Sequence, residues 1–117
     1  MELAAKPEGP FHAVDALEDT GSVYTWVPGQ ALRELGLEAA ERIEFIMANG
    51  RHEFRDAVEA VMRLDGRVRH TICVFGQDSD QVLLGAYALE GFGLAADPVN
   101  RRLVPMPTLP AAPVDNE

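Results

Sequence analysis

Short apolar runs separated by turn residues dominate the chain, and this pattern predicts strands more often than helices. Residues 11–17 and 23–27 are rich in apolar, β-branched and aromatic side chains. The polar residues 19–22 between them are predicted to form the connecting loop. Residues 42–48 alternate imperfectly between apolar and polar, and the Asn49-Gly50 pair that follows is a strong signal for a two-residue hairpin.

Residues 53–64 fit two periodicities. Apolar residues at positions 54, 57, 58, 61 and 62 would line one face of a helix, whereas those at positions 58, 60, 62 and 64 alternate as in a strand. Periodicity alone slightly favours the helix. We predict a strand, because Asp65-Gly66 is a second hairpin signal and residues 67–75 alternate cleanly after it.

Two short helices are predicted. One covers residues 31–35, between Pro28-Gly29 and Gly36, and the other covers residues 86–92 and ends at Gly93. Short strands are predicted around the second helix, at residues 82–84, 94–96 and 102–104, with a turn over 98–100. The pattern therefore predicts an all-β fold class, mainly β with one or two short helices.

The two ends of the chain lack a hydrophobic period. Residues 1–10 contain Pro and Gly and are predicted to be a flexible arm. Residues 105–117 contain a proline at every second or third position and are predicted to be a Pro-rich tail. One globular domain is expected over residues 11–104, which suits a chain of 117 residues.

The net charge of −9 argues against nucleic acid as a partner, because that affinity depends on clustered Lys and Arg. The one basic cluster, at positions 63, 67 and 69, is expected to be a solvated face. No apolar run approaches the roughly 20 residues that span a bilayer, so no membrane association is expected. Cys73 is the only cysteine and Met1 is not followed by a signal-like segment, so we expect a cytoplasmic protein.

Several kinds of site have little support. His12, His52 and His70 do not stand at metal-ligand spacing with Cys73, so we expect no metal and no cofactor. Cys73 lies in an apolar stretch, where a thiol is usually an inert small hydrophobe. No nucleophile-elbow pattern surrounds Ser22, and the scattered glycines form no phosphate loop.

Two short motifs carry the strongest functional signal. Asp19-Thr20-Gly21 has a counterpart in Val82-Leu83-Leu84-Gly85 far downstream. An isolated Asp-Thr-Gly most often only reverses the chain. The two motifs in this order and spacing resemble the retroviral-type (retropepsin-like) aspartic proteases, most closely their bacterial single-domain members. The resemblance covers roughly residues 11 to 105, with further short matches at 16–22, 24–28, 35–37, 48–50 and 86–98.

This resemblance implies an acid-protease barrel with one lobe per chain and a β-hairpin over residues 53–64. It implies that Asp19 is catalytic, that Thr20 forms hydrogen bonds across a dimer axis, and that Gly21 allows close backbone approach. Leu84 and Gly85 would pack behind the catalytic turn. The residues that correspond to the family's flap, a lid over bound peptide, are Ala48, Asn49, Gly50 and Arg51.

Hydrolysis of a peptide by water without a metal needs one group that accepts a proton and one that donates it. Two carboxylates that share a proton supply both. The chain has a single Asp-Thr-Gly, so the second Asp19 would come from another copy through a two-fold axis. The expected function is thus an aspartic endopeptidase that acts on peptides or proteins as a homodimer. The alternative is a catalytically silent dimerisation or peptide-binding module with the same fold.

The chain departs from the family pattern at several positions. The residue before the catalytic Asp is usually apolar, but here it is Glu18, which either points to solvent on the opposite face from Asp19 or raises the pKa of Asp19 by like-charge repulsion. Many members pair an Arg and an acid at the positions of Ala86 and Val23. The segment before the catalytic loop is also short. Tyr24 and Trp26 could form pocket walls, although we favour the core for them.

Overall fold

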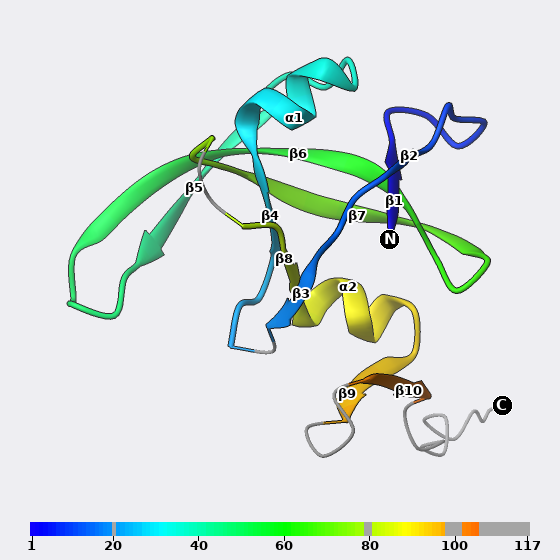
Figure 1. Ribbon diagram of the computed structural model, residues 1–117. Coiled ribbons are helices and arrows are strands. Elements are labelled where there is room, and N and C mark those ends of the chain that lie inside the picture. Colours follow the sequence, from blue (N-terminus) through cyan, green and yellow to red (C-terminus); the bar gives the residue numbers. More distant parts are fainter. Residues whose placement is uncertain (20, 79–80, 98–101, 106–117) are drawn as a thin grey trace, which may run out of the picture.

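The computed structural model describes residues 1–19, 21–78, 81–97 and 102–105. One sheet has the strand order β2-β1-β6-β7-β4-β8-β3, with β5 paired to β6, and β9 and β10 form a separate hairpin (Figure 1). The strands are β1 (Glu2–Ala4), β2 (His12–Ala13), β3 (Leu17–Asp19), β4 (Thr25–Pro28), β5 (Glu41–Ile46), β6 (His52–Leu64), β7 (Arg67–Gly76), β8 (Leu83–Gly85), β9 (Leu94–Asp97) and β10 (Arg102–Pro105). The helices are α1 (Gly29–Glu34) and α2 (Ala86–Gly91).

The long hairpin of β6 and β7 is the centre of the sheet and confirms the strand predicted over residues 53–64. Asp65 and Gly66 both have positive φ, at 54° and 75°, as a tight hairpin turn requires. The middle of β6 is buried on both faces, at Val58 and Ala60 on one side and at Val61 on the other. Burial on both faces explains why the apolar positions of this segment also fit a helical period.

Both helices pack against one continuous core. Leu32 of α1 and Leu89 of α2 are almost fully buried. The main core cluster joins them to side chains of the sheet and of the segments after the two helices: Leu3, Val27, Leu37, Val58, Ala60, Met62, Cys73, Phe75, Leu84, Phe92 and Leu94. A core of this kind fixes β8 and α2 relative to the central hairpin, and these two elements flank the site described below.

The N-terminal segment differs from its prediction. The flexible arm expected over residues 1–10 is wrong for Glu2–Ala4, which form β1 and pair with both β6 and β2. Leu3 is fully buried, and Arg63 of β6 donates hydrogen bonds of 2.6 and 2.9 Å to the Glu2 carboxylate. These hydrogen bonds lower the pKa of Glu2. A three-residue strand next to Pro and Gly is too short to show an alternation of apolar and polar residues in the sequence.

Two further expectations are corrected. Residues 11–17 do not form one strand, because β2 ends at Ala13 and β3 begins at Leu17. The cluster of Arg63, Arg67 and Arg69 is not uniformly solvated, because Arg63 is half-buried and lies 4.1 Å from the centre of the Phe11 ring.

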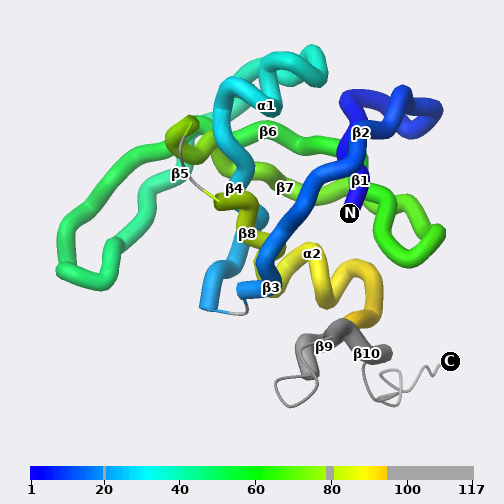
Figure 2. The backbone as a smooth tube through the Cα atoms, viewed as in Figure 1, coloured from blue at the N-terminus to red at the C-terminus, as the bar shows by residue number. Residues whose placement is uncertain are grey.

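The backbone trace in Figure 2 follows the chain from β8 directly into α2. β10 ends at Pro105. The predicted turn over 98–100 and the Pro-rich residues 106–117 lie outside the described residues. In the described part of the chain, no helix is both long and apolar enough to cross a membrane.

Candidate active site

Asp19 is the last residue of β3, and the sheet brings it beside the downstream motif. β3 pairs in parallel with β8, so that Leu17 is opposite Leu83 and Asp19 is opposite Gly85. β8 in turn lies between β3 and β4, the strand that follows the Asp19 loop (Figure 1). The two motifs singled out in the sequence are therefore adjacent in the structure, and the Asp19 side chain is half-buried between them and solvent.

Two backbone N–H groups of the loop bond to Asp19, one to its carboxylate and one to its main-chain carbonyl. The Gly21 N–H donates to Asp19 Oδ1 at 3.0 Å, and the Ser22 N–H donates to the Asp19 carbonyl oxygen at 3.1 Å. A Cβ atom on Gly21 would lie 3.2 Å from Oδ1, so a glycine leaves room for this close approach. Thr20 lies outside the described residues, and its predicted role stays a prediction.

The first turn of α2 fastens the same loop. Ala86 and Tyr87 donate their N–H groups to the carbonyl oxygens of Ser22 and Val23, at 2.8 and 2.9 Å. The first N–H groups of a helix have no partner within the helix, so the loop supplies acceptors that the helix needs. The Asp19 loop is thereby fixed to α2, and through Leu89 of α2 to the core.

Gly85 of β8 and Thr25 of β4 hold these two strands together next to the loop. The Gly85 N–H donates to Thr25 Oγ1 at 3.2 Å, and Thr25 is fully buried. A Cβ atom on Gly85 would lie 2.3 Å from the Tyr24 carbonyl oxygen, so only glycine fits. Leu84, the residue before Gly85, is buried in the core cluster. Sequence reasoning missed Thr25, whose role depends on a partner 60 residues away.

The strands β4, β8 and β3 have one core face and one open face. Successive side chains of a strand point to opposite faces, and paired residues share a face. Val27 and Leu84 are buried on the core face. Asp19 therefore shares the open face with Leu17, and Glu18, which is opposite Leu84, points the other way. Glu18 thus lies on the opposite face from Asp19, as expected, but this is the core face, and Glu18 is half-buried rather than fully solvated.

Aromatic side chains form a wall on the open face. Trp26, which is opposite Leu83, lies 5.0 Å from the Phe45 ring of β5, measured between ring centroids. Tyr24 lies 6.3 Å from Phe45 and 6.2 Å from Tyr87. Tyr24 and Trp26 are half-buried and stand outside the core cluster, so the preference for core positions is wrong.

The hairpin of β5 and β6 projects beyond the rest of the sheet, and its tip lies apart from the Asp19 loop (Figure 1). Its turn is held by local bonds: the Met47 N–H donates to the Arg51 carbonyl oxygen at 2.8 Å, and the Arg51 N–H donates to Asn49 Oδ1 at 2.9 Å. Ala48, Asn49, Gly50 and Arg51 are all exposed. Within one copy, the structure does not bring these four residues to Asp19.

Other reactive side chains lie elsewhere. Burial raises the pKa of the Cys73 thiol to about 12, because the apolar core disfavours the thiolate. His52 lies 2.8 Å from a Glu44 carboxylate oxygen and His70 lies 3.6 Å from one of Glu59, both on the surface. Among the described residues, no group of three or more His, Cys, Asp or Glu is placed to hold a metal ion.

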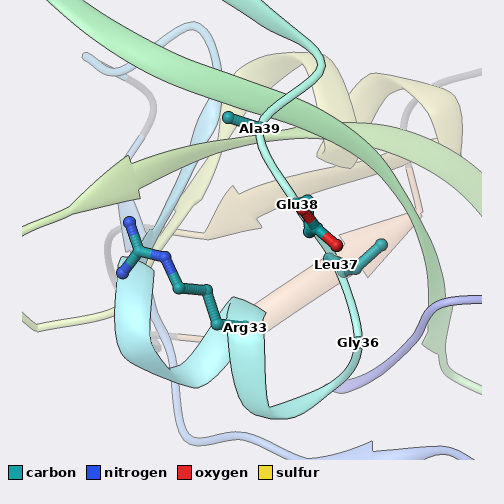
Figure 3. A pocket seen from close by; sticks show the side chains of 5 residues that line it. All are labelled: Arg33, Gly36, Leu37, Glu38 and Ala39. Carbon is teal, nitrogen blue, oxygen red and sulfur yellow. The ribbon is translucent and has the colours of Figure 1, made fainter.

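Three surface cavities, of about 510, 330 and 320 Å³, are lined by residues other than Asp19. The largest lies beside the chain segment that follows α1, between Arg33 and Ala39, and contains no predicted site residue (Figure 3). A single copy thus presents Asp19 on an open face rather than in any of these three cavities.

The fold matches the solution structure of the Simian Foamy Virus (mac) protease, with a TM-score of 0.53 and 18% sequence identity. The match covers 79% of this chain and 94% of that chain. No family model and no curated protein matches the sequence. The structural match confirms the predicted fold class: the chain is a mainly β half-barrel with two short helices, as in retropepsin-like proteases.

Proposed function

We propose that this chain is an aspartic endopeptidase that hydrolyses peptide bonds as a homodimer. The observation that carries the proposal is the position of Asp19: it ends β3 opposite Gly85, on the open face of the sheet, in a loop fastened by backbone hydrogen bonds. A rigid carboxylate at an open face suits a catalyst that must hold its geometry. Because each chain supplies one such carboxylate, two copies make one site.

In this dimer the two Asp19 carboxylates share one proton. The ionised one accepts a proton from a water molecule, whose oxygen attacks the peptide carbonyl carbon, while the protonated one donates to the carbonyl oxygen. The tetrahedral intermediate then collapses as the amine leaves with a proton. Because the step needs one ionised and one protonated carboxylate, the rate should fall on both sides of an optimum pH.

We also infer a substrate preference from the residues of the open face. Leu17, Leu83 and the half-buried ring of Trp26 lie on the face that Asp19 shares, and Phe45 packs against Trp26. Large apolar side chains of a peptide would bury apolar surface there, at about 25 cal/mol per Å². We therefore expect cleavage next to apolar rather than charged residues.

The projecting hairpin is proposed as the lid. Ala48, Asn49, Gly50 and Arg51 are exposed, and Phe45, close to the tip of the hairpin, contacts Trp26 on the open face. Closure over a peptide would exclude water from the two carboxylates and complete the site.

The experiment is a peptide-library cleavage assay across pH, with purified wild type, Asp19→Asn and the matched control Asp15→Asn. Asp15 is an exposed aspartate close in sequence to Asp19. We expect Asp19→Asn to lose about 10²–10⁴-fold in rate, the usual contribution of a general acid or base, and Asp15→Asn to cleave like wild type. Cleavage that survives in Asp19→Asn would contradict the proposal.

The alternative is a catalytically silent module that keeps the fold and binds peptides or a second copy. Glu18 supports this alternative, because the family that the chain resembles usually has an apolar residue before its catalytic Asp. A wild-type protein that forms dimers but cleaves no library peptide at any pH would support this alternative.

A further inference from the structure

The β5–β6 hairpin, which projects beyond the rest of the sheet (Figure 1), has two unlike faces. Four half-buried residues form the face that we call the inner face: Ile43 and Phe45 of β5 and, opposite them, Arg55 and Glu53 of β6. Paired residues of two strands share a face, and the residues that alternate with these, at 42, 44, 52 and 54, are exposed. Phe45 lies 5.0 Å from Trp26, measured between ring centroids, so the inner face is turned toward the open face that carries Asp19.

The inner face carries an ion pair beside its apolar side chains. Arg55 donates through Nη2 to Glu53 Oε1 and through Nη1 to the Phe54 carbonyl oxygen, the latter at 3.1 Å. The Arg55 and Glu53 side chains are only 27% and 30% exposed. Within the described part of the chain, the contact to Glu53 is made at Oε1, which leaves Oε2 to accept from a further donor. The hairpin thus presents a carboxylate, held by Arg55, on the side that is turned toward the open face.

We propose that Glu53 selects the substrate by binding a basic side chain, Lys or Arg, of the peptide beneath the lid. The inference rests on the proposed function and adds a substrate class to that site. Both terminal nitrogens of Arg55 already donate a hydrogen bond, whereas Glu53 has an oxygen left, so the pair is better suited to receive a cation than an anion. The net charge of −9 also attracts cationic peptides.

The basic residue would lie beside the apolar residues that flank the cleaved bond. Glu53 is directly opposite Phe45 on the inner face, and Phe45 packs against Trp26. The aromatic side chains then receive the apolar residues next to the bond, and Glu53 receives a side chain at a neighbouring position of the peptide. A hydrogen bond between two charged groups is stronger than one between neutral groups, and salt weakens it. We therefore expect the preference for basic peptides to decrease as the salt concentration rises, while the preference for apolar residues remains.

The test compares Glu53→Gln with the matched control Asp56→Asn in the full chain. Asp56 lies on the other face of the same hairpin, opposite Arg42 and 3.9 Å from it. Both variants remove one negative charge, so a difference between them cannot come from the net charge. The substrates are three peptide pools that differ only in the residues flanking an apolar centre, which are Lys, Gln or Glu, and kcat/KM is measured for each pool.

We expect wild type and Asp56→Asn to cleave the Lys pool about tenfold faster than the Gln pool, as a hydrogen bond between charged groups predicts. Glu53→Gln should cleave these two pools at rates within about twofold of each other, because its amide cannot attract a cation as a carboxylate does. Thermal unfolding checks that each variant is folded.

A double variant, Glu53→Gln with Arg55→Gln, keeps the test decisive if the single variant folds poorly, because it leaves no unpaired charge on the inner face. It too should lose the preference for Lys. A preference that survives in either folded variant would overturn the role of Glu53, and so would a wild type that cleaves the Gln or Glu pool as fast as the Lys pool; in both cases the protease stands.

If wild type cleaves none of the pools, the protease is wrong, and binding decides the role of Glu53 by itself. Fluorescence anisotropy then measures the affinity of the labelled pools for wild type, Glu53→Gln and Asp56→Asn. Tighter binding of the Lys pool that is lost only in Glu53→Gln would support the role of Glu53. Equal binding of the three pools, or no binding, would overturn it.

Discussion

The Asp19 loop and the β5–β6 hairpin are both turns that connect strands, but their surroundings hold them very differently. The loop makes hydrogen bonds to α2, and β8 is locked behind it by Gly85 and Thr25. The hairpin tip is held by bonds among its own residues, and Ala48 to Arg51 are exposed. The hydrogen bonds of the Asp19 loop run to another element, whereas those of the hairpin tip stay within the tip, and only Phe45 beside it packs against Trp26 and Tyr24.

This difference corresponds to the two roles in the proposed enzyme, a fixed catalytic carboxylate and a movable lid. A carboxylate that must face its twin needs a fixed position, since a shift of about 1 Å can cost 10²-fold in rate. A lid must open for the peptide and close over it, and such segments come from the least stable parts of a structure. The following changes test whether the two turns differ in this way, from the largest expected effect to the smallest.

The largest loss of stability is expected for Gly85→Ala. The added Cβ would meet the Tyr24 carbonyl oxygen at 2.3 Å, so β4 and β8 would have to separate. Overpacking typically costs about 1–3 kcal/mol and occasionally more, and a 2.3 Å contact with backbone belongs at the upper end of this range. Urea unfolding measures the free energy, and a variant as stable as wild type would show that β8 is not locked as described.

Thr25→Val should cost about 1–3 kcal/mol, because the buried Gly85 N–H would lose its acceptor while the side-chain volume stays nearly constant. Thr25→Ser is the control that keeps the hydroxyl. If Val and Ser variants unfold at the same urea concentration, the hydrogen bond contributes nothing and the loop owes its position to packing alone.

Gly50→Ala is the counterpart of Gly85→Ala in the hairpin. No atom lies within 4 Å of the position that a Cβ would take, so the only cost is the positive φ of 84°, about 1–2 kcal/mol. We expect this cost to appear as local opening of the hairpin in amide hydrogen exchange, with little change in global unfolding. If Gly50→Ala lowered the free energy of global unfolding as much as Gly85→Ala does, the two turns would not differ in the way described here.

The ion pair of Glu2 and Arg63 lies outside both turns and supplies the smallest effect. Arg63 lowers the pKa of Glu2 from its ordinary value of 4.5, so the pair stabilises the fold above that pH and loses its effect as the pH falls through the lowered value. Glu2→Gln should therefore be slightly less stable than wild type at neutral pH and equal to it in acid. A difference that grows in acid would contradict this assignment.

Local signals in the sequence predict the two hairpins of the frame, whereas the pairing at the candidate site joins distant residues. Asn49-Gly50 and Asp65-Gly66 specify turns through residues that tolerate positive φ, and both hairpins form where they were expected. Local pattern cannot show that Asp19 pairs with Gly85, because that pairing joins residues far apart in the chain. Only the resemblance in the order of the two motifs indicated it.

The misses have physical reasons. β1 is three residues long, and Leu3 is buried by pairing with β6 rather than by any local preference. Trp26 looked like a core residue because it lies in an apolar strand, but its partner Leu83 is on the open face. Burial depends on which face of a sheet is covered, and a strand's own alternation does not decide between the two faces.

The central claim is that two copies each supply one Asp19 to a single site, and a mixing experiment tests it most directly. Wild type is equilibrated with an excess of Asp19→Asn chains, and peptide cleavage is measured at fixed wild-type concentration. Mixed dimers hold only one carboxylate, so a tenfold excess should lower cleavage about tenfold. Cleavage that is unchanged by the excess would show that one chain acts alone and would contradict the account.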